Sequence, residues 1–155
     1  MNAVGAQGRG ESVWLGWFLL GTIAAFTPHA ERRGEGERTR RWTDYAADLR
    51  NALEHAWDGH WYRRGYYADG TPLGSHESTQ CQIHATAQSW RVMPRAPIPE
   101  HAAQAIASVD RRLIDHPNRP ALLFTPPTAS RKPQPGPPKA YPTRARPAPL
   151  HDPPP

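Results

Sequence analysis

The sequence predicts a mainly α-helical chain with one short aromatic strand or hairpin and a disordered, proline-rich tail. Apolar residues recur at helical spacing in four stretches. An aromatic segment followed by an Asp-Gly turn separates the second stretch from the third. Of the 19 prolines, 12 fall in residues 126–155, where too few large apolar residues remain to offset the entropy of ordering.

The first predicted helix, Glu11–Phe26, is apolar nearly all round and is expected to end at Thr27-Pro28. Its apolar run, Val13–Phe26, has 14 residues, fewer than the roughly 20 that cross a bilayer. The run has some features of a signal peptide, but its tryptophans and glycines favour a packed core helix. A helix that is apolar on every side must lie inside something larger.

The second predicted helix follows a segment of mixed charge, Glu31–Arg41, which is typical of a solvated helix face. One apolar stripe at helical spacing defines this helix, and Asp58-Gly59 is expected to end it. The stripe consists of Trp42, Tyr45, Ala46, Leu49, Leu53, Ala56 and Trp57.

The aromatic segment His60–Tyr67 is suited to a short strand, and Ala68–Pro72 carries turn chemistry. A polar loop, Leu73–Gln82, comes next. Ile83–Val92 is predicted to be a third helix that Pro94 closes.

A fourth helix is predicted to start at Glu100 and to stop before His116-Pro117, because apolar residues recur there at intervals of three and four. The remaining helices barely supply partners for the first one. We therefore expect residues 1–125 to be part of a larger helical domain and residues 126–155 to be a disordered tail.

The net charge is +5 and the isoelectric point is near 9.9, but part of the excess lies in the tail. Since no recognition motif accompanies the charge, a nucleic-acid partner is not expected. With one cysteine, Cys81, the chain forms no internal disulfide. This fits a reducing compartment, and we expect a cytoplasmic location.

Residues of the types that bind sugars are concentrated in Asp58–Gly74. Its aromatic rings offer flat faces, its arginines are fixed donors, and its aspartates accept from hydroxyls. Inward packing of a strand is the alternative for about half of these positions. Neither a metal nor another cofactor is expected, because His76, Cys81 and His84 lack the usual ligand spacing. No serine elbow or Walker-type loop is present.

Five separated motifs occur in order along the chain. They are Gly8-Arg9-Gly10-Glu11-Ser12-Val13-Trp14-Leu15-Gly16-Trp17-Phe18, Trp57-Asp58-Gly59-His60-Trp61-Tyr62-Arg63-Arg64-Gly65-Tyr66, Asp69-Gly70-Thr71-Pro72-Leu73-Gly74-Ser75, Ala87-Gln88-Ser89-Trp90 and Leu123-Phe124-Thr125-Pro126-Pro127. Together they resemble the catalytic domain of inverting glycoside phosphorylases of the cellobiose phosphorylase family (glycoside hydrolase family 94). The resemblance is greatest to the corresponding domain of cyclic β-1,2-glucan synthases.

This resemblance implies a fragment of an (α/α)6 barrel. It also implies phosphorolysis or transfer on β-linked glucan, with inorganic phosphate as the second substrate and no cofactor. Arg64, Tyr66, Asp69 and Gln88 are carried over as candidates for binding sugar or phosphate. If the parent enzyme is anchored at an inner membrane, the anchor is expected in segments absent from this chain.

The departures from the family pattern predict a truncated remnant without activity of its own. Met1-Asn2 resembles the end of an Asp-Trp-Asn-Asp-Gly-Met-Asn motif, which would place the general acid just before Met1. Acidic residues are usual where Gln80 and His84 stand, and small or apolar residues where Arg91 and Pro94 stand. After Pro127 the pattern fails, as a shifted reading frame would cause.

Two other functional classes stay open at this point. The first is a small basic binding protein whose tail, with Pro135 and Pro138 in Pro-x-x-Pro spacing, docks into a partner. The second is a spurious product that does not fold, because the helix faces of an incomplete barrel favour aggregation.

Overall fold

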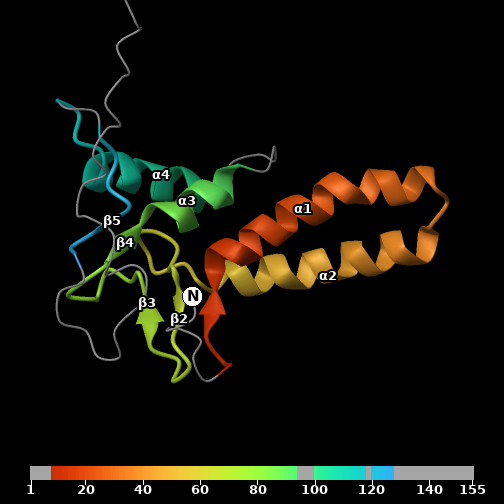
Figure 1. Ribbon diagram of the computed structural model, residues 1–155, viewed down its shortest axis with the longest axis horizontal. Helices are drawn as coiled ribbons and strands as arrows, with labels where there is room; N and C mark the ends of the chain where they lie inside the picture. Colours follow the sequence, from red (N-terminus) through yellow and green to blue (C-terminus); the bar gives the residue numbers. More distant parts are fainter. Residues whose placement is uncertain (1–7, 94–99, 118–119, 128–155) are drawn as a thin grey trace, which may run out of the picture.

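The computed structural model describes residues 8–93, 100–117 and 120–127, and within them the chain is mainly helical, as predicted (Figure 1). The helices are α1 (Val13–Arg32), α2 (Gly36–Glu54), α3 (Ala85–Val92) and α4 (Glu100–Leu113). The strands have two residues each: β1 (Glu11–Ser12), β2 (Gly65–Tyr66), β3 (Pro72–Leu73), β4 (Ile83–His84) and β5 (Phe124–Thr125). Nearly all of the predicted tail lies outside the described residues.

Helices α1 and α2 form an antiparallel hairpin that projects away from the other elements (Figure 1). Gly34, with φ of 71°, lies in the turn between them. At the base of the hairpin, Leu53 of α2 packs against Gly16 of α1. A Cβ atom on Gly16 would lie 2.6 Å from the Leu53 side chain, so the glycine allows the close approach.

The prediction that Thr27-Pro28 ends the first helix is wrong, because α1 continues to Arg32 with Pro28 inside it. Proline removes one backbone donor, yet α1 still packs against its surroundings beyond this point, where Ala30 is buried. The main-chain N–H of Arg33 then closes the helix on the carbonyls of His29 and Ala30.

At 20 residues, α1 is long and apolar enough to cross a membrane by length and composition alone. The argument that this segment is too short to span a bilayer is therefore wrong. A core helix of a soluble domain passes the same test, so the result is weak evidence for a membrane span.

The second helix also differs from its prediction at the C-terminal end. It stops at Glu54, and the segment Trp57–Tyr62 forms a loop with one isolated bridge between its ends. Of the expected strand His60–Tyr67, only Gly65–Tyr66 is extended and paired. Instead of a neighbouring strand, the side chains of Asp58 and Gln88 accept hydrogen bonds from the backbone N–H groups of Trp61 and Tyr62.

A small antiparallel sheet joins the start of α1 to the middle of the chain, in the order β1-β2-β3. Glu11 pairs with Tyr66, and Gly65 pairs with Leu73. A side chain on Gly65 would collide with the carbonyl of Glu11. The predicted Asp-Gly turn is confirmed: Gly70 has φ of 83° and its N–H donates to the Tyr67 carbonyl over 2.9 Å.

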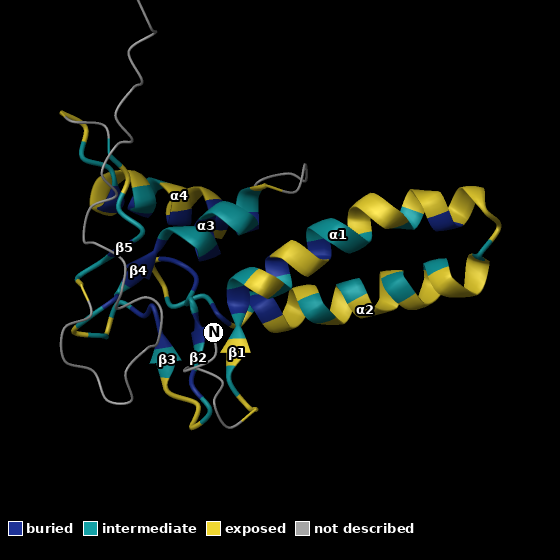
Figure 2. Ribbon diagram, viewed as in Figure 1, coloured by how far each residue is buried: buried dark blue, intermediate teal, exposed yellow. Residues whose placement is uncertain are grey.

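Helices α3 and α4 pack together beside this sheet, and β4 pairs with β5 (Figure 1). The third helix begins two residues later than predicted, because Ile83–His84 is the strand β4. The fourth helix matches its prediction. Figure 2 shows that burial is concentrated in this half of the molecule and at the base of the hairpin, while the far part of the hairpin is largely exposed.

Candidate functional site

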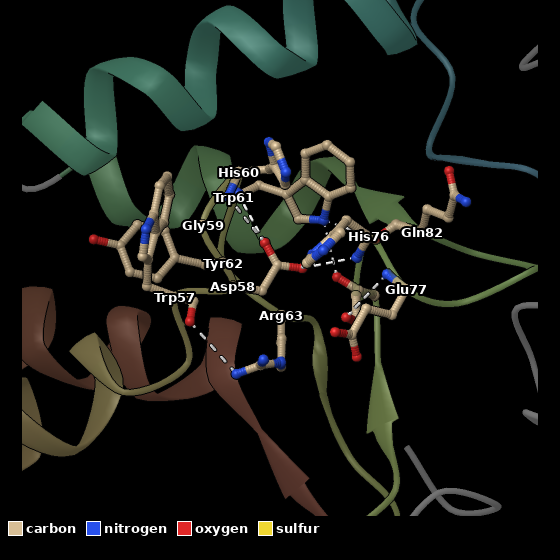
Figure 3. A network of polar contacts seen from close by, with 12 residues as sticks. Trp57, Asp58, Gly59, His60, Trp61, Tyr62, Arg63, His76, Glu77 and Gln82 are labelled. Atoms are coloured by element: carbon tan, nitrogen blue, oxygen red, sulfur yellow. Dashed lines mark hydrogen bonds and ion pairs between the residues drawn. The ribbon is translucent and has the colours of Figure 1, made fainter.

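A buried carboxylate organises the loop Trp57–Tyr62 (Figure 3). The Asp58 side chain is fully enclosed. Its Oδ1 accepts from the main-chain N–H groups of His60 and Trp61 over 3.2 and 3.1 Å. Its Oδ2 accepts from the N–H of His76 over 2.7 Å and lies 3.2 Å from Nδ1 of the same residue. Asp58 therefore shapes two loops and has a structural role.

Trp61 connects the loop Trp57–Tyr62 to three other parts of the chain through its indole ring. Its indole N–H is shared between the carbonyls of Gly74 and Gln82, at 3.0 and 2.8 Å. The guanidinium of Arg112 on α4 lies 4.9 Å from its ring centroid. The Trp61 ring is 1% exposed, so its faces are not open to a sugar.

Gln88 of α3 pairs with the backbone of Tyr62 as a neighbouring strand would. Its Oε1 accepts from the Tyr62 N–H over 2.9 Å, and its Nε2 donates to the Tyr62 carbonyl over 2.8 Å. The same Nε2 donates to the carbonyl of His84 over 3.2 Å. Gln88 is 0% exposed, so its amide binds backbone groups of the chain and does not face solvent.

A partly buried ion pair joins the end of α2 to α3, with Arg91 6% and Glu54 35% exposed. Arg91 Nη2 lies 2.9 Å from Glu54 Oε1, and the Tyr62 hydroxyl donates to Glu54 Oε2 over 2.7 Å. The Arg91 guanidinium also lies 4.6 Å from the Trp17 ring centroid. Burial, reinforced by the hydrogen bond to Glu54, raises the pKa of Tyr62 to about 12.

The four predicted binding residues do not form one cluster in the described structure. Arg64 and Tyr66 lie on and beside β2, both half-buried, and Asp69 lies exposed in the β2–β3 turn, where its Oδ1 accepts from the Thr71 N–H. Gln88 is enclosed in the core. Their roles in binding stay predictions.

Arg64 lies against an aromatic surface that the sequence analysis did not single out. Its guanidinium is 5.6 Å from the Trp14 ring centroid, and its Nη1 donates to the Ser12 hydroxyl over 3.1 Å. Trp14 and Phe18 of α1 contact Trp90 of α3 at centroid distances of 6.2 and 5.0 Å. Burial lowers the pKa of Arg64 to about 10, which leaves it charged at neutral pH. The i, i+4 spacing of Trp14 and Phe18 places both rings on one face of a helix, and it is the sequence feature that could have predicted this aromatic surface.

Of the aromatic residues suited to a sugar platform, Trp61, Tyr62 and Tyr67 are buried, which is the inward packing given as the alternative. Only Tyr66 keeps part of its surface. The histidines give no metal centre in the described part of the chain, where no group of three or more suitable ligands is found. Burial, together with the charge of Arg64, lowers the pKa of His84 to about 3.

Comparison with known sequences identifies the family of domains to which these helices belong. A profile of the glycosyl hydrolase 94 superfamily catalytic domain matches residues 1–146, nearly the whole chain. The chain belongs to the glycosyl hydrolase 94 superfamily. Its paired helices are a fragment of the (α/α)6 barrel of that domain. The match also covers the first part of the proline-rich segment that begins at Pro126.

Individual members of the superfamily are similar over most of this chain. It is 47% identical over 147 residues to the cyclic β-(1,2)-glucan synthase NdvB of Rhizobium meliloti, covering 94% of this chain and 5% of that protein. It is 33% identical over 127 residues to a 3-O-β-D-glucopyranosyl-β-D-glucuronide phosphorylase of Paenibacillus borealis, covering 81% of this chain and 16% of that protein. A solabiose phosphorylase of the same organism is also 33% identical. This glycosyl hydrolase 94 chain thus spans only a small part of these relatives.

Proposed function

We propose that this chain is part of the catalytic domain of a glucan-processing enzyme of the cyclic β-1,2-glucan synthase type. The identity of 47% to such a synthase over 94% of the chain carries the proposal. The phosphorylase names of other relatives support phosphorolysis or transfer as the reaction class, with a β-linked glucan and inorganic phosphate as substrates.

We further propose that the chain is inactive alone. Glycoside cleavage needs a carboxylic acid that protonates the leaving oxygen. Among the described residues, the Asp58 carboxylate accepts hydrogen bonds from backbone N–H groups. The Glu54 carboxylate accepts from the Tyr62 hydroxyl and from Arg91. Asp69 holds its own turn. We propose that the acid function is supplied by other parts of the domain.

The first experiment is an assay of the isolated chain for phosphate-dependent release of glucose 1-phosphate from β-1,2-glucan. No release above background is expected. Release that scales with the concentration of the chain would refute the proposed inactivity, and the assignment of the acid function with it.

The second experiment tests the parent reaction. The 147 aligned residues of the Rhizobium meliloti synthase are replaced by those of this chain, and glucan formation by the hybrid is expected to persist. In the hybrid, Arg64→Ala is expected to lower activity roughly 10- to 100-fold, the value of one lost charge-assisted hydrogen bond.

Arg40→Ala, at an exposed position on α2, is the matched control and should leave activity unchanged. A folded hybrid without activity would contradict the proposed function. Equal effects of the two arginine substitutions would remove Arg64 from the binding residues.

A further inference from the structure

Two histidines from different loops lie side by side at the surface (Figure 3). The ring centroids of His60 and His76 are 4.7 Å apart, and the ring planes are inclined by 67°. His60 is exposed, and the His76 side chain is 37% exposed. In the sequence, His76 stands nearest to Cys81 and His84, whereas the fold places the imidazole of His60 beside it.

One buried carboxylate holds both histidines in place. Asp58 accepts the main-chain N–H of His60 through Oδ1 over 3.2 Å and that of His76 through Oδ2 over 2.7 Å. The Asp58 side chain is 0% exposed, so these charge-assisted bonds are shielded from water, which strengthens them. The backbone segments that carry the two imidazoles are therefore fixed relative to each other before a ligand arrives.

The same carboxylate determines which nitrogen of His76 is available to a ligand. Nδ1 of His76 is enclosed and lies 3.2 Å from Asp58 Oδ2, so the exposed part of the ring is the side that carries Nε2. Histidines that bind a metal through one ring nitrogen usually direct the other nitrogen at a carboxylate, which fixes the tautomer and raises the basicity of the ligand. Asp58 and His76 have this arrangement.

The separation of the two rings suits two ligands of one metal ion. A bond from zinc to an imidazole nitrogen is about 2.0–2.1 Å long, and the ring centroid lies about 1.2 Å behind that nitrogen. Two imidazoles on one ion then have centroids roughly 4.5 Å apart at a right angle and roughly 5.2 Å apart at the tetrahedral angle. The observed 4.7 Å lies between these values. Because the His60 side chain is exposed, its ring can turn toward the ion while the backbone stays in place.

We infer that His60 and His76 bind a divalent transition-metal ion of the group Cu²⁺, Ni²⁺ and Zn²⁺. Imidazole nitrogen suits these ions, and the negative charge of Asp58 behind His76 favours a cation over an anion. The histidines supply two ligands and water supplies the rest, because the described residues contain no group of three or more His, Cys, Asp or Glu that could hold a metal ion. A bound ion would connect the loop Trp57–Tyr62 to the loop that carries His76. This inference does not depend on the proposed function.

The test uses the full chain and Cu²⁺ alone as the probe, since Cu²⁺ binds nitrogen sites most tightly in the divalent series. Calorimetric titration should show one site that His60→Asn and His76→Asn each weaken at least about tenfold, because even the loss of an outer-shell partner costs about 10- to 100-fold. His55→Asn, at the exposed C-terminal cap of α2, is the matched control and should change the dissociation constant less than about twofold.

Electron paramagnetic resonance of the Cu²⁺ complex identifies the ligands without relying on affinity. Nitrogen couplings from two imidazoles are expected in the unaltered chain, and from fewer in either asparagine variant. Both substitutions keep the main-chain N–H groups that Asp58 binds, and the melting temperature without metal checks that each variant folds. If His76→Asn does not fold, His60→Asn at its exposed position decides the test.

Four results would overturn the inference. The first two are a Cu²⁺ complex with fewer than two imidazole nitrogens and equal effects of His60→Asn and His55→Asn on affinity. The third is binding spread over several weak sites, which would mean adventitious metal only. The fourth is binding of inorganic phosphate that His60→Asn abolishes, without binding of Cu²⁺, which would assign the pair to an anion.

Discussion

At the scale of single residues, the structure turns polar side chains inward to hold backbone groups. Asp58, Gln88 and Glu54 each make two or more such contacts or ion pairs in or beside the loop Trp57–Tyr62. Buried polar groups must be paired because an unsatisfied one costs about 1–3 kcal/mol. The contacts explain why this loop holds its shape without regular secondary structure.

The first residue-scale prediction concerns Gln88. Gln88→Leu leaves the N–H and carbonyl of Tyr62 without their partners in the core, so it should lower the free energy of unfolding by about 2–4 kcal/mol. Urea denaturation followed by circular dichroism measures this loss. The control is Gln104→Leu at an exposed position of α4. The Gln104 amide makes one bond, to the Gly59 carbonyl, and its loss should cost under about 1 kcal/mol.

The second residue-scale prediction concerns acid stability. His84 is neutral in the folded chain because burial and Arg64 lower its pKa from 6.5 to about 3. Because the unfolded chain binds this proton near pH 6.5 and the folded chain does not, the fold loses stability as pH falls from 6.5 toward 3. His84→Asn keeps an acceptor at the start of α3 and should flatten the fall in melting temperature over this range. An unchanged pH profile would show that His84 is not the group responsible.

At the scale of elements, α1 differs from its prediction because the helix continues through Pro28 to Arg32. Proline disfavours a helix interior because it lacks the N–H and its ring crowds the preceding turn. Pro28 nevertheless lies inside α1, as an exposed residue that lines the groove between α1 and α2. Residues of α1 line this groove up to Pro28, together with Ala46 of α2, and Ala30 beyond the proline is buried.

The prediction at this scale is that Pro28→Ala stabilises the chain. It restores the backbone donor in an exposed part of the helix, which should raise the free energy of unfolding by about 1–3 kcal/mol. Thermal unfolding measures the gain, and Glu31→Ala in the next turn serves as a control with less than about 0.5 kcal/mol of change. A loss of stability would mean that the proline ring makes packing contacts that alanine cannot replace.

At the scale of the whole molecule, the ion pair between Glu54 and Arg91 connects the hairpin to the α3–α4 half. Arg91 is 6% exposed. A buried arginine needs its partner, because a buried charge without one is strongly unfavourable. The two halves are therefore expected to unfold together.

The prediction for the Glu54–Arg91 ion pair is that the effects of two substitutions on the free energy of unfolding are not additive. Glu54→Gln should cost about 1–3 kcal/mol, because Arg91 loses the charge of a carboxylate that is itself 35% exposed. Adding Arg91→Met should recover most of that loss, because the buried charge is then gone. Two-state urea unfolding of the single and double variants measures the coupling, and additive losses would show that the pair does not hold the halves together.

Much of the fold follows from the sequence alone. Apolar periodicity predicted four helices, Asp69-Gly70 predicted the hairpin turn, and five ordered motifs predicted the superfamily. These features are visible because helix spacing and turn chemistry act over a few neighbouring residues. The unmet burial needs of the first helix likewise indicated that the chain is part of a larger domain.

Only the tertiary structure decided which side chains serve the core. Trp61 and Tyr62 had the composition of a sugar platform, but packing against α3 and α4 buries them, and Gln88 is used to pair the Tyr62 backbone. Contacts between residues 26 or 37 positions apart, such as Tyr62–Gln88 and Glu54–Arg91, leave no local pattern in the sequence. They form because most buried donors and acceptors find a partner once the helices have packed.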